Sequence, residues 1–296
     1  MEGLFPLLMA WLCGAAIFTC FRWLETLRAD TLLVIVINYF VAAGLGWVLA
    51  GGWETFASAW PATWVITAML AGAAFLYLFH LMATAARTLG VTVTSVSAKL
   101  SMVLPVLVFL VFDPSDEWSW NKGLALATTL PAIVLSSWQS NQSGLSIREL
   151  RIPLIIFLGG GAIDLMFGWF SGPEHMTEAR YRYLFTTLPF TVAGVIGAMM
   201  LVLRRKTPHK SNASPSLLAT SSIGIGLGII NLGSLYFLLE AYAQLPLDRS
   251  AIAPVVNLGI VVLSAAFAVA FFREPLNKAN LWGLFLACTA IALLAF

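Results

Sequence analysis

The sequence predicts an all-α integral membrane protein with ten transmembrane helices, built as two inverted repeats of five helices. Three observations lead to this prediction: the composition, the spacing of the apolar runs, and a sequence block that occurs twice. Of the 296 residues, 60% are hydrophobic and 10% are charged, whereas soluble domains carry roughly 25% charged residues. A water-soluble fold of this length could not hide so much apolar surface in one core.

Ten apolar runs are long enough to cross a bilayer, which takes about 20 residues per helix. Short polar connections separate them, and the connection after the fifth run is a natural boundary between two halves. We expect a first repeat at 1–138, a second repeat at 152–296 and a linker at 139–151. The ten runs lie, in chain order, at 4–21, 31–51, 62–86, 91–112, 121–138, 152–171, 181–203, 217–243, 250–272 and 279–296.

Basic residues mark the connections, and their distribution predicts an orientation. Without Lys99, which lies inside the fourth run, fifteen of the sixteen basic residues remain, eleven in odd-numbered and four in even-numbered connections. The positive-inside rule then predicts cytoplasmic odd-numbered connections and both termini outside. The odd-numbered connections hold Arg22, Arg28, Arg87, Arg148, Arg151, Arg204, Arg205, Lys206, Lys210, Arg273 and Lys278, and the even-numbered ones hold Lys122, Arg180, Arg182 and Arg249.

A block in the first half recurs, in weaker form, in the second half. Residues 89–96 (LGVTVTSV) correspond to residues 245–252 (LPLDRSAI), and a long apolar helix follows each copy. Each copy then reaches a carboxylate, a short polar stretch and another apolar run. Because five runs separate the copies, an odd number, the second copy must be upside-down relative to the first. Inverted repeats of this kind are typical of secondary transporters, whose binding site lies at midplane between the halves.

Two charged residues lie deep inside the runs, where a charge is costly and indicates function. Lys99 lies roughly 12 Å into the fourth run and Asp164 about 18 Å into the sixth, entered from the same face. We predict that Lys99 and Asp164 face one another and that substrate releases one of them. The alternative is a fixed structural ion pair. His80 lies at a similar depth. It either contacts substrate or protons directly or is a hydrogen-bonded core residue.

Polar side chains repeat at helical spacing around these residues, which predicts a polar cavity between the spans. The glycines beside Asp164 would let another helix approach closely. The alternative is that the stripes only join helices, at about 0.6 kcal/mol per hydrogen bond, but this does not account for the ionisable groups within them. The stripes are Tyr77, His80, Thr84 and Arg87; Thr92, Ser95 and Lys99; and Gly161, Asp164, Gly168 and Ser171.

Asn231 and Asn257 are neutral polar residues inside the eighth and ninth runs, where each either binds a solute or braces a neighbouring helix. Gly224 and Gly228 predict a helix-packing face and not a nucleotide loop. The sequence has no nucleophile–base pair, no metal-ligand spacing and no Walker loop, so we expect neither an enzyme nor a cofactor nor an ATP-driven pump. The candidate substrate-binding residues are Lys99, Asp164, His80, Asn231, Asn257, Tyr77 and Ser95.

Three segments carry a resemblance to a known family: residues 90–105 (GVTVTSVSAKLSMVLP), residues 158–164 (LGGGAID), and Pro254 to Asn257 continuing to 273–276 (REPL). Over nearly its full length the chain resembles the drug/metabolite transporter superfamily, specifically its EamA-type members. The resemblance implies a central cavity lined by the third, fourth, eighth and ninth spans, alternating access, and transport of small metabolites without ATP. It also implies cytoplasmic termini, opposite to the orientation that the basic residues predict.

The leading hypothesis is a secondary transporter, an exporter or exchanger, for a small polar metabolite such as an amino acid. Lys99 would hold an anionic group, and Asp164 or His80 would take protons or an amine. The alternatives are an integral-membrane enzyme acting on a lipid-like substrate and a non-transporting sensor or assembly subunit. We expect a monomer or homodimer in a bacterial-type inner membrane, without a cleavable signal peptide. The small net charge of +2 gives no reason to expect nucleic-acid binding.

Overall fold

A computed structural model describes residues 3–26, 30–88, 98–114, 116–136, 151–171, 178–203, 217–273 and 276–295. These residues form helices and contain no β-strand, so the all-α prediction is confirmed for the described part of the chain. The helices are α1 (Leu4–Thr26), α2 (Thr31–Ala50), α3 (Gly52–Ala59), α4 (Thr63–Thr88), α6 (Val103–Phe112), α7 (Trp120–Ser136), α8 (Arg151–Phe170), α9 (Ala179–Leu203), α10 (Leu217–Gln244), α11 (Arg249–Phe272) and α12 (Lys278–Ala295).

The described part of each of the ten apolar runs contains a helix, but the helices differ in their length and hydropathy. In the run predicted at 91–112, residues 91–97 lie outside the described residues and α6 begins at Val103, after a turn at 101–102. Five are long and apolar enough to cross a membrane: α2, α8, α9, α10 and α11. The bent pair α3 and α4 would count as a sixth span. Leu4–Ile17, Ala98–Phe112 and Lys278–Leu294 are shorter apolar helices. These lengths and compositions are compatible with a membrane protein.

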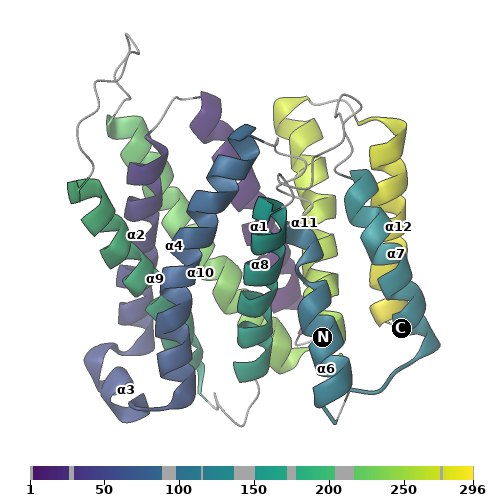
Figure 1. Cartoon of the computed structure of the whole chain (residues 1–296), viewed down its shortest axis with the longest axis horizontal. Helices are drawn as coiled ribbons and strands as arrows, with labels where there is room; N and C mark the ends of the chain where they lie inside the picture. The colour runs from purple at the N-terminus through teal and green to yellow at the C-terminus, as the bar shows by residue number, and fades with distance from the viewer. Residues whose placement is uncertain are drawn as a thin grey trace.

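Helix α3 lies in a segment where the sequence predicted only a connection. It meets α4 at an angle of 115° and lies at the lower edge of Figure 1, across the direction of the long helices. Gly51 allows the turn from α2 into α3 because its φ of 85° is left-handed. Trp53 and Trp60 are exposed on this segment, as expected for aromatic residues at a membrane–water interface.

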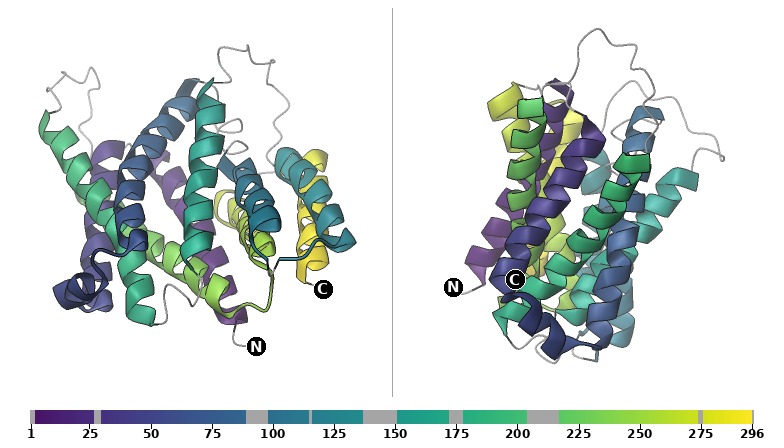
Figure 2. Two further views of the ribbon diagram at one scale, coloured as in Figure 1. Left: turned by 60° about the horizontal axis from the view of Figure 1, so that its bottom comes forward. Right: turned by 90° about the vertical axis from the view of Figure 1, so that its left-hand side faces the viewer.

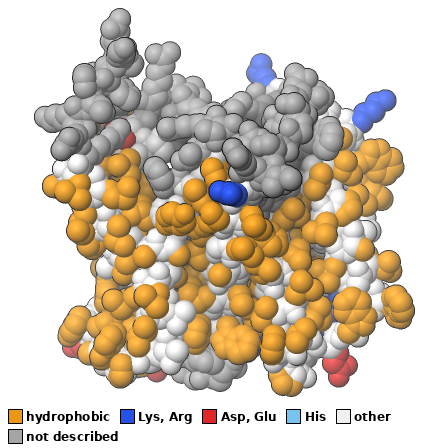
Figure 3. Space-filling model, viewed as in Figure 1, with side chains coloured by type: hydrophobic (Ala, Val, Ile, Leu, Met, Phe, Trp, Pro, Cys, Tyr) orange, Lys and Arg blue, Asp and Glu red, His pale blue; other side chains and the backbone are white. Residues whose placement is uncertain are grey.

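The long helices stand side by side, and both chain ends lie at the lower edge of the molecule in Figure 1. We call this edge the terminus face. It also holds α3, the connection between α6 and α7, and the connection between α10 and α11, as the turned views of Figure 2 show. Apolar side chains cover the middle of the outer surface in Figure 3, with blue cationic side chains toward the top and red acidic side chains at the bottom.

Each long helix of the first half packs on helices of the second half. Helix α1 packs on α10 and α11, α2 on α9 and α10, α4 on α8 and α9, α6 on α8 and α11, and α7 on α11 and α12. Close approaches occur at small residues: a Cβ atom at Gly72 of α4 would lie 2.6 Å from the carbonyl oxygen of Pro189 in α9. The predicted packing face at Gly224 and Gly228 is confirmed, since both contact α2.

The core consists of apolar clusters between these helices. One cluster contains Phe167, Leu184, Phe185 and Leu239, from α8, α9 and α10, all at most 1% exposed. A second surrounds Tyr39 of α2 and Phe190 of α9, which are fully buried and stacked at a centroid distance of 5.9 Å. Buried polar side chains lie between these apolar clusters, and their contacts across helices make up the candidate site.

Candidate functional site

Asp164 lies in α8 where α8 meets the turn before α6. Its Oδ2 accepts a hydrogen bond from Ser101 Oγ at 3.4 Å. The approach is close because α8 has glycines here: a Cβ atom at Gly160 would lie 3.0 Å from Ser101 Oγ, and one at Gly161 would lie 2.7 Å from Ser101 O. The sequence-based expectation that a helix approaches the glycine face beside Asp164 is confirmed.

The hydrogen bond to Asp164 is long and shared. Ser101 Oγ also lies 2.6 Å from Ala98 O, and one hydroxyl group donates only one proton. The bond to the carbonyl has the usual length and the bond to the carboxylate exceeds it. The hydrogen bond from Ser101 therefore stabilises an ionised Asp164 only weakly. A protonated Asp164 could instead donate its own hydrogen bond to Ser101 Oγ.

The expected ion pair between Lys99 and Asp164 is not among the ion pairs that join described residues. Lys99 lies two residues before Ser101, at the turn that precedes α6. Ser101 is the residue that contacts Asp164 at this turn. Sequence spacing predicted that Lys99 and Asp164 lie at similar depth, but it did not predict the contact with Ser101.

A tyrosine hydroxyl lies one helical turn from Asp164 without a hydrogen-bond partner. Tyr242 of α10 is 9% exposed, and its hydroxyl oxygen has no hydrogen bond. A Cβ atom at Gly168 would lie 3.1 Å from this oxygen, so the hydroxyl faces α8 at the residue one turn after Asp164. Buried hydroxyl groups usually have a partner, and a bound water or solute would supply one here.

Tyr77, another residue predicted to bind substrate, lies on the outer surface of the bundle. Tyr77 is 56% exposed on the same face of α4 as Ile66 and Leu70, which are also exposed. The side chain of His80 and all of Ser95 lie outside the described residues.

The two predicted asparagines have helix partners. Asn231 of α10 donates through Nδ2 to Asn38 Oδ1 of α2 at 3.2 Å, and Asn257 donates to Ala253 O of its own helix at 3.1 Å. For Asn231 this contact fits the bracing alternative, and Asn38 was not singled out from the sequence. Asn38 is fully buried, and its Nδ2 atom has no hydrogen-bond partner.

Sequence reasoning also missed a buried polar group between α9 and α10. Arg182 Nε donates to Glu240 Oε1 at 2.6 Å, with side chains that are 15% and 6% exposed. Gln244 Nε2 lies 2.5 Å from the other oxygen of Glu240. Beside them the rings of Tyr183 and Tyr236 stack at 3.9 Å. A single sequence offers no signal for this pair, since its partners come from different helices.

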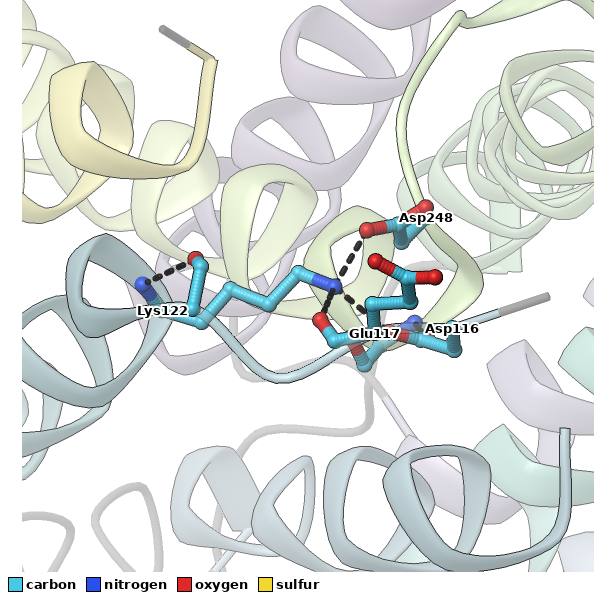
Figure 4. Close-up of polar contacts among 6 residues, drawn as sticks. Asp116, Glu117, Lys122 and Asp248 are labelled. Carbon is cyan, nitrogen blue, oxygen red and sulfur yellow. Dashed lines mark hydrogen bonds and ion pairs between the residues drawn. The ribbon is translucent and has the colours of Figure 1, made fainter. Parts of the chain in front are cut away.

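A second missed network lies on the terminus face and is drawn in Figure 4. Lys122 Nζ, at the start of α7, lies 2.6 Å from Asp116 Oδ1 and also contacts Asp248. Asp116 in turn accepts hydrogen bonds from Ser250 N at 2.8 Å and Ser250 Oγ at 2.9 Å. The network therefore joins the α6–α7 connection of the first half to the start of α11 in the second.

Within the described residues, no group of three or more His, Cys, Asp or Glu side chains is arranged to hold a metal ion. Cys13, Cys20 and Cys288 are free cysteines. The described arrangement thus offers hydrogen-bonding and charged groups inside a helix bundle, which suit reversible binding of a polar solute.

Comparisons with known proteins bear on the fold. No family model matches the chain. An uncharacterised protein of Haemophilus influenzae is 24% identical over 215 residues, which cover 72% of this chain and 69% of that protein. A solved crystal structure matches 98% of this chain and 98% of its own, with a TM-score of 0.69 and 13% sequence identity. At this identity the likeness shows a shared fold and nothing about activity.

Proposed function

We propose that this chain is a secondary transporter for a small polar metabolite, such as an amino acid, of the EamA type within the drug/metabolite transporter superfamily. Its ten apolar runs would all cross a bacterial inner membrane, as two inverted repeats of five. The observation that carries the proposal is the pattern of helix packing, because it follows the symmetry that an inverted repeat requires.

An inverted repeat with an offset of five spans makes α1 equivalent to α8, α2 to α9, α4 to α10, α6 to α11 and α7 to α12. Equivalent contacts should then occur in pairs. The contact of α4 with α9 corresponds to the contact of α10 with α2. In the same way, the contact of α1 with α10 corresponds to that of α8 with α4, and the contact of α1 with α11 corresponds to that of α8 with α6. Three further pairs, α2–α9, α6–α11 and α7–α12, join equivalent helices, as expected for helices that meet at a pseudo-two-fold axis. The contact between α11 and α12 has no counterpart of similar extent between α6 and α7.

Inside this arrangement Asp164 is the strongest candidate for a coupling residue. It has one long hydrogen bond from Ser101, and the unpartnered hydroxyl of Tyr242 lies one turn away. We propose that Asp164 binds a proton in one conformation and an ammonium group of the solute in the other. Such an exchange would couple flux to the proton gradient, since binding of either ligand shifts the population of the two conformations. Lys99 stays the candidate for an anionic group of the solute.

The test is counterflow of radiolabelled amino acids in proteoliposomes. Asp164→Asn removes the ionisable group with little change in volume, and we expect it and Lys99→Ala to abolish flux while the protein still inserts. Glu178→Gln is the matched control, because Glu178 is an exposed residue that pairs with Arg180 in its own segment. Full counterflow in both variants would remove the proposed site, and no counterflow in wild type across a metabolite panel would remove the proposed function.

A further inference from the structure

We propose that the α6–α7 connection and the start of α11 form a latch of ion pairs and hydrogen bonds that holds the terminus face closed. This inference rests on the proposed alternation between two conformations. The terminus-face latch consists of Asp113, Asp116, Lys122, Asp248, Arg249 and Ser250.

Asp116 caps a helix of the other half. Helix α11 begins after Asp248, whose side chain makes no capping hydrogen bond. The first-turn N–H of Ser250 is instead bonded to Asp116, at 2.8 Å. A carboxylate at a helix N-terminus satisfies an otherwise unpaired N–H group and interacts favourably with the helix dipole. The first half of the chain thus completes α11.

Lys122 ties the same two segments together from the other side. Its Nζ atom donates to Asp116 Oδ1 at 2.6 Å and to Glu117 O at 2.5 Å. It also forms an ion pair with Asp248, whose carboxylate makes this contact and no capping hydrogen bond. The side chain of Asp116 is 1% exposed and that of Lys122 is 11% exposed. Arg249 adds a longer contact to Asp113, at 3.6 Å. Separating these buried partners would leave charges that only water entering the face could solvate.

The repeat predicts which residues take these positions on the opposite face. When residues 89–96 are aligned with residues 245–252, the equivalents of Asp248, Arg249 and Ser250 are Thr92, Val93 and Thr94. Residues 89–96 contain no charged side chain, so this block does not supply the carboxylate and the cation that Asp248 and Arg249 supply to the latch. The latch therefore favours the conformation that is closed at the terminus face.

Thiol labelling of purified protein, without any solute, tests the latch. In a background of Cys13→Ala, Cys20→Ala and Cys288→Ala, Ala251→Cys places a thiol directly behind the latch, where Ala251 is 2% exposed. Thr220→Cys reports on the opposite end, where Thr220 is 1% exposed. A membrane-impermeant maleimide then measures how often each end opens.

We expect Asp116→Asn to raise the labelling rate at position 251 about tenfold, the effect of losing one charge-assisted hydrogen bond, with no such rise at position 220. Glu178→Gln, which removes an ion pair on the same face within one segment, should change neither rate. Equal rises at both positions, or no rise at 251, would overturn the latch. If Asp116→Asn is not monodisperse, Lys122→Gln makes the same comparison. Since labelling needs no flux, this result is independent of the counterflow test.

Discussion

Glu240 lies inside the helix bundle, and side chains of α9 and α10 donate hydrogen bonds to both oxygens of its carboxylate. Arg182 bonds one oxygen and Gln244 the other. We predict that Glu240→Ala lowers the free energy of unfolding by about 3–5 kcal/mol, because breaking a buried pair leaves the remaining charge poorly solvated. Thermal unfolding in detergent, followed by circular dichroism, measures the change.

The exposed pair between Arg180 and Glu178 is the comparison for this prediction. Its side chains are 48% and 55% exposed, so Glu178→Ala should leave the midpoint of thermal unfolding nearly unchanged. Equal midpoints for the two variants would mean that Glu240 is solvated in the folded protein, contrary to its 4% exposure.

The polar residues illustrate what sequence spacing predicts and what it does not. Depth along a helix follows from residue number, and so Asp164 was placed in the interior, beside a close helix contact, from the sequence alone. Rotation about the helix axis and the identity of the neighbouring helix depend on tertiary packing. For that reason Lys99 was predicted to pair with Asp164 where the structure has Ser101, and the partnership of Arg182 with Glu240 was missed.

Packing between α2 and α10 depends on single glycines, and two of them provide a matched test. A Cβ atom at Gly228 would lie 2.7 Å from the backbone oxygen of Asn38, whereas one at Gly226 would meet nothing within 4 Å. We predict that Gly228→Ala destabilises the protein by about 1–3 kcal/mol, the usual cost of overpacking. Gly226→Ala should be neutral or slightly stabilising, since alanine favours the helix. Midpoints of thermal unfolding that fall equally for both would contradict the proposed contact.

Most helices were predicted within a few residues, because runs of about 20 apolar residues allow little else. The run predicted at 91–112 differs, because its helix α6 begins at Val103, and helix α3 was not predicted at all. It has eight residues, its apolar and polar residues are mixed, and glycine precedes it while proline follows it. A connection is the ordinary interpretation of such a segment. Its helical form depends on contacts with α2 and α9, which are not visible in a local sequence window.

The two repeats predicted from the sequence are interleaved in space. Among the described residues, helices of the first half have few contacts with one another, such as those of α2 with α3 and of Tyr39 in α2 with Phe79 in α4, while α1, α2, α4, α6 and α7 all pack on helices of the second half. The second half also has contacts of its own, for example between α11 and α12. The duplication in sequence therefore indicated symmetry, but it did not indicate that each half completes the other.

Interleaving predicts how the chain should behave when it is cut. A break between Ser143 and Gly144, in the linker, leaves every helix intact and separates the two halves. We predict that the first half expressed alone is insoluble or degraded, because its helices lack the partners that bury them. Co-expressed with a tagged second half, it should co-purify and remain monodisperse in size-exclusion chromatography. A first half that is stable and protease-resistant by itself would mean that its helices pack on one another, contrary to the arrangement in which α2 meets α9 and α7 meets α12.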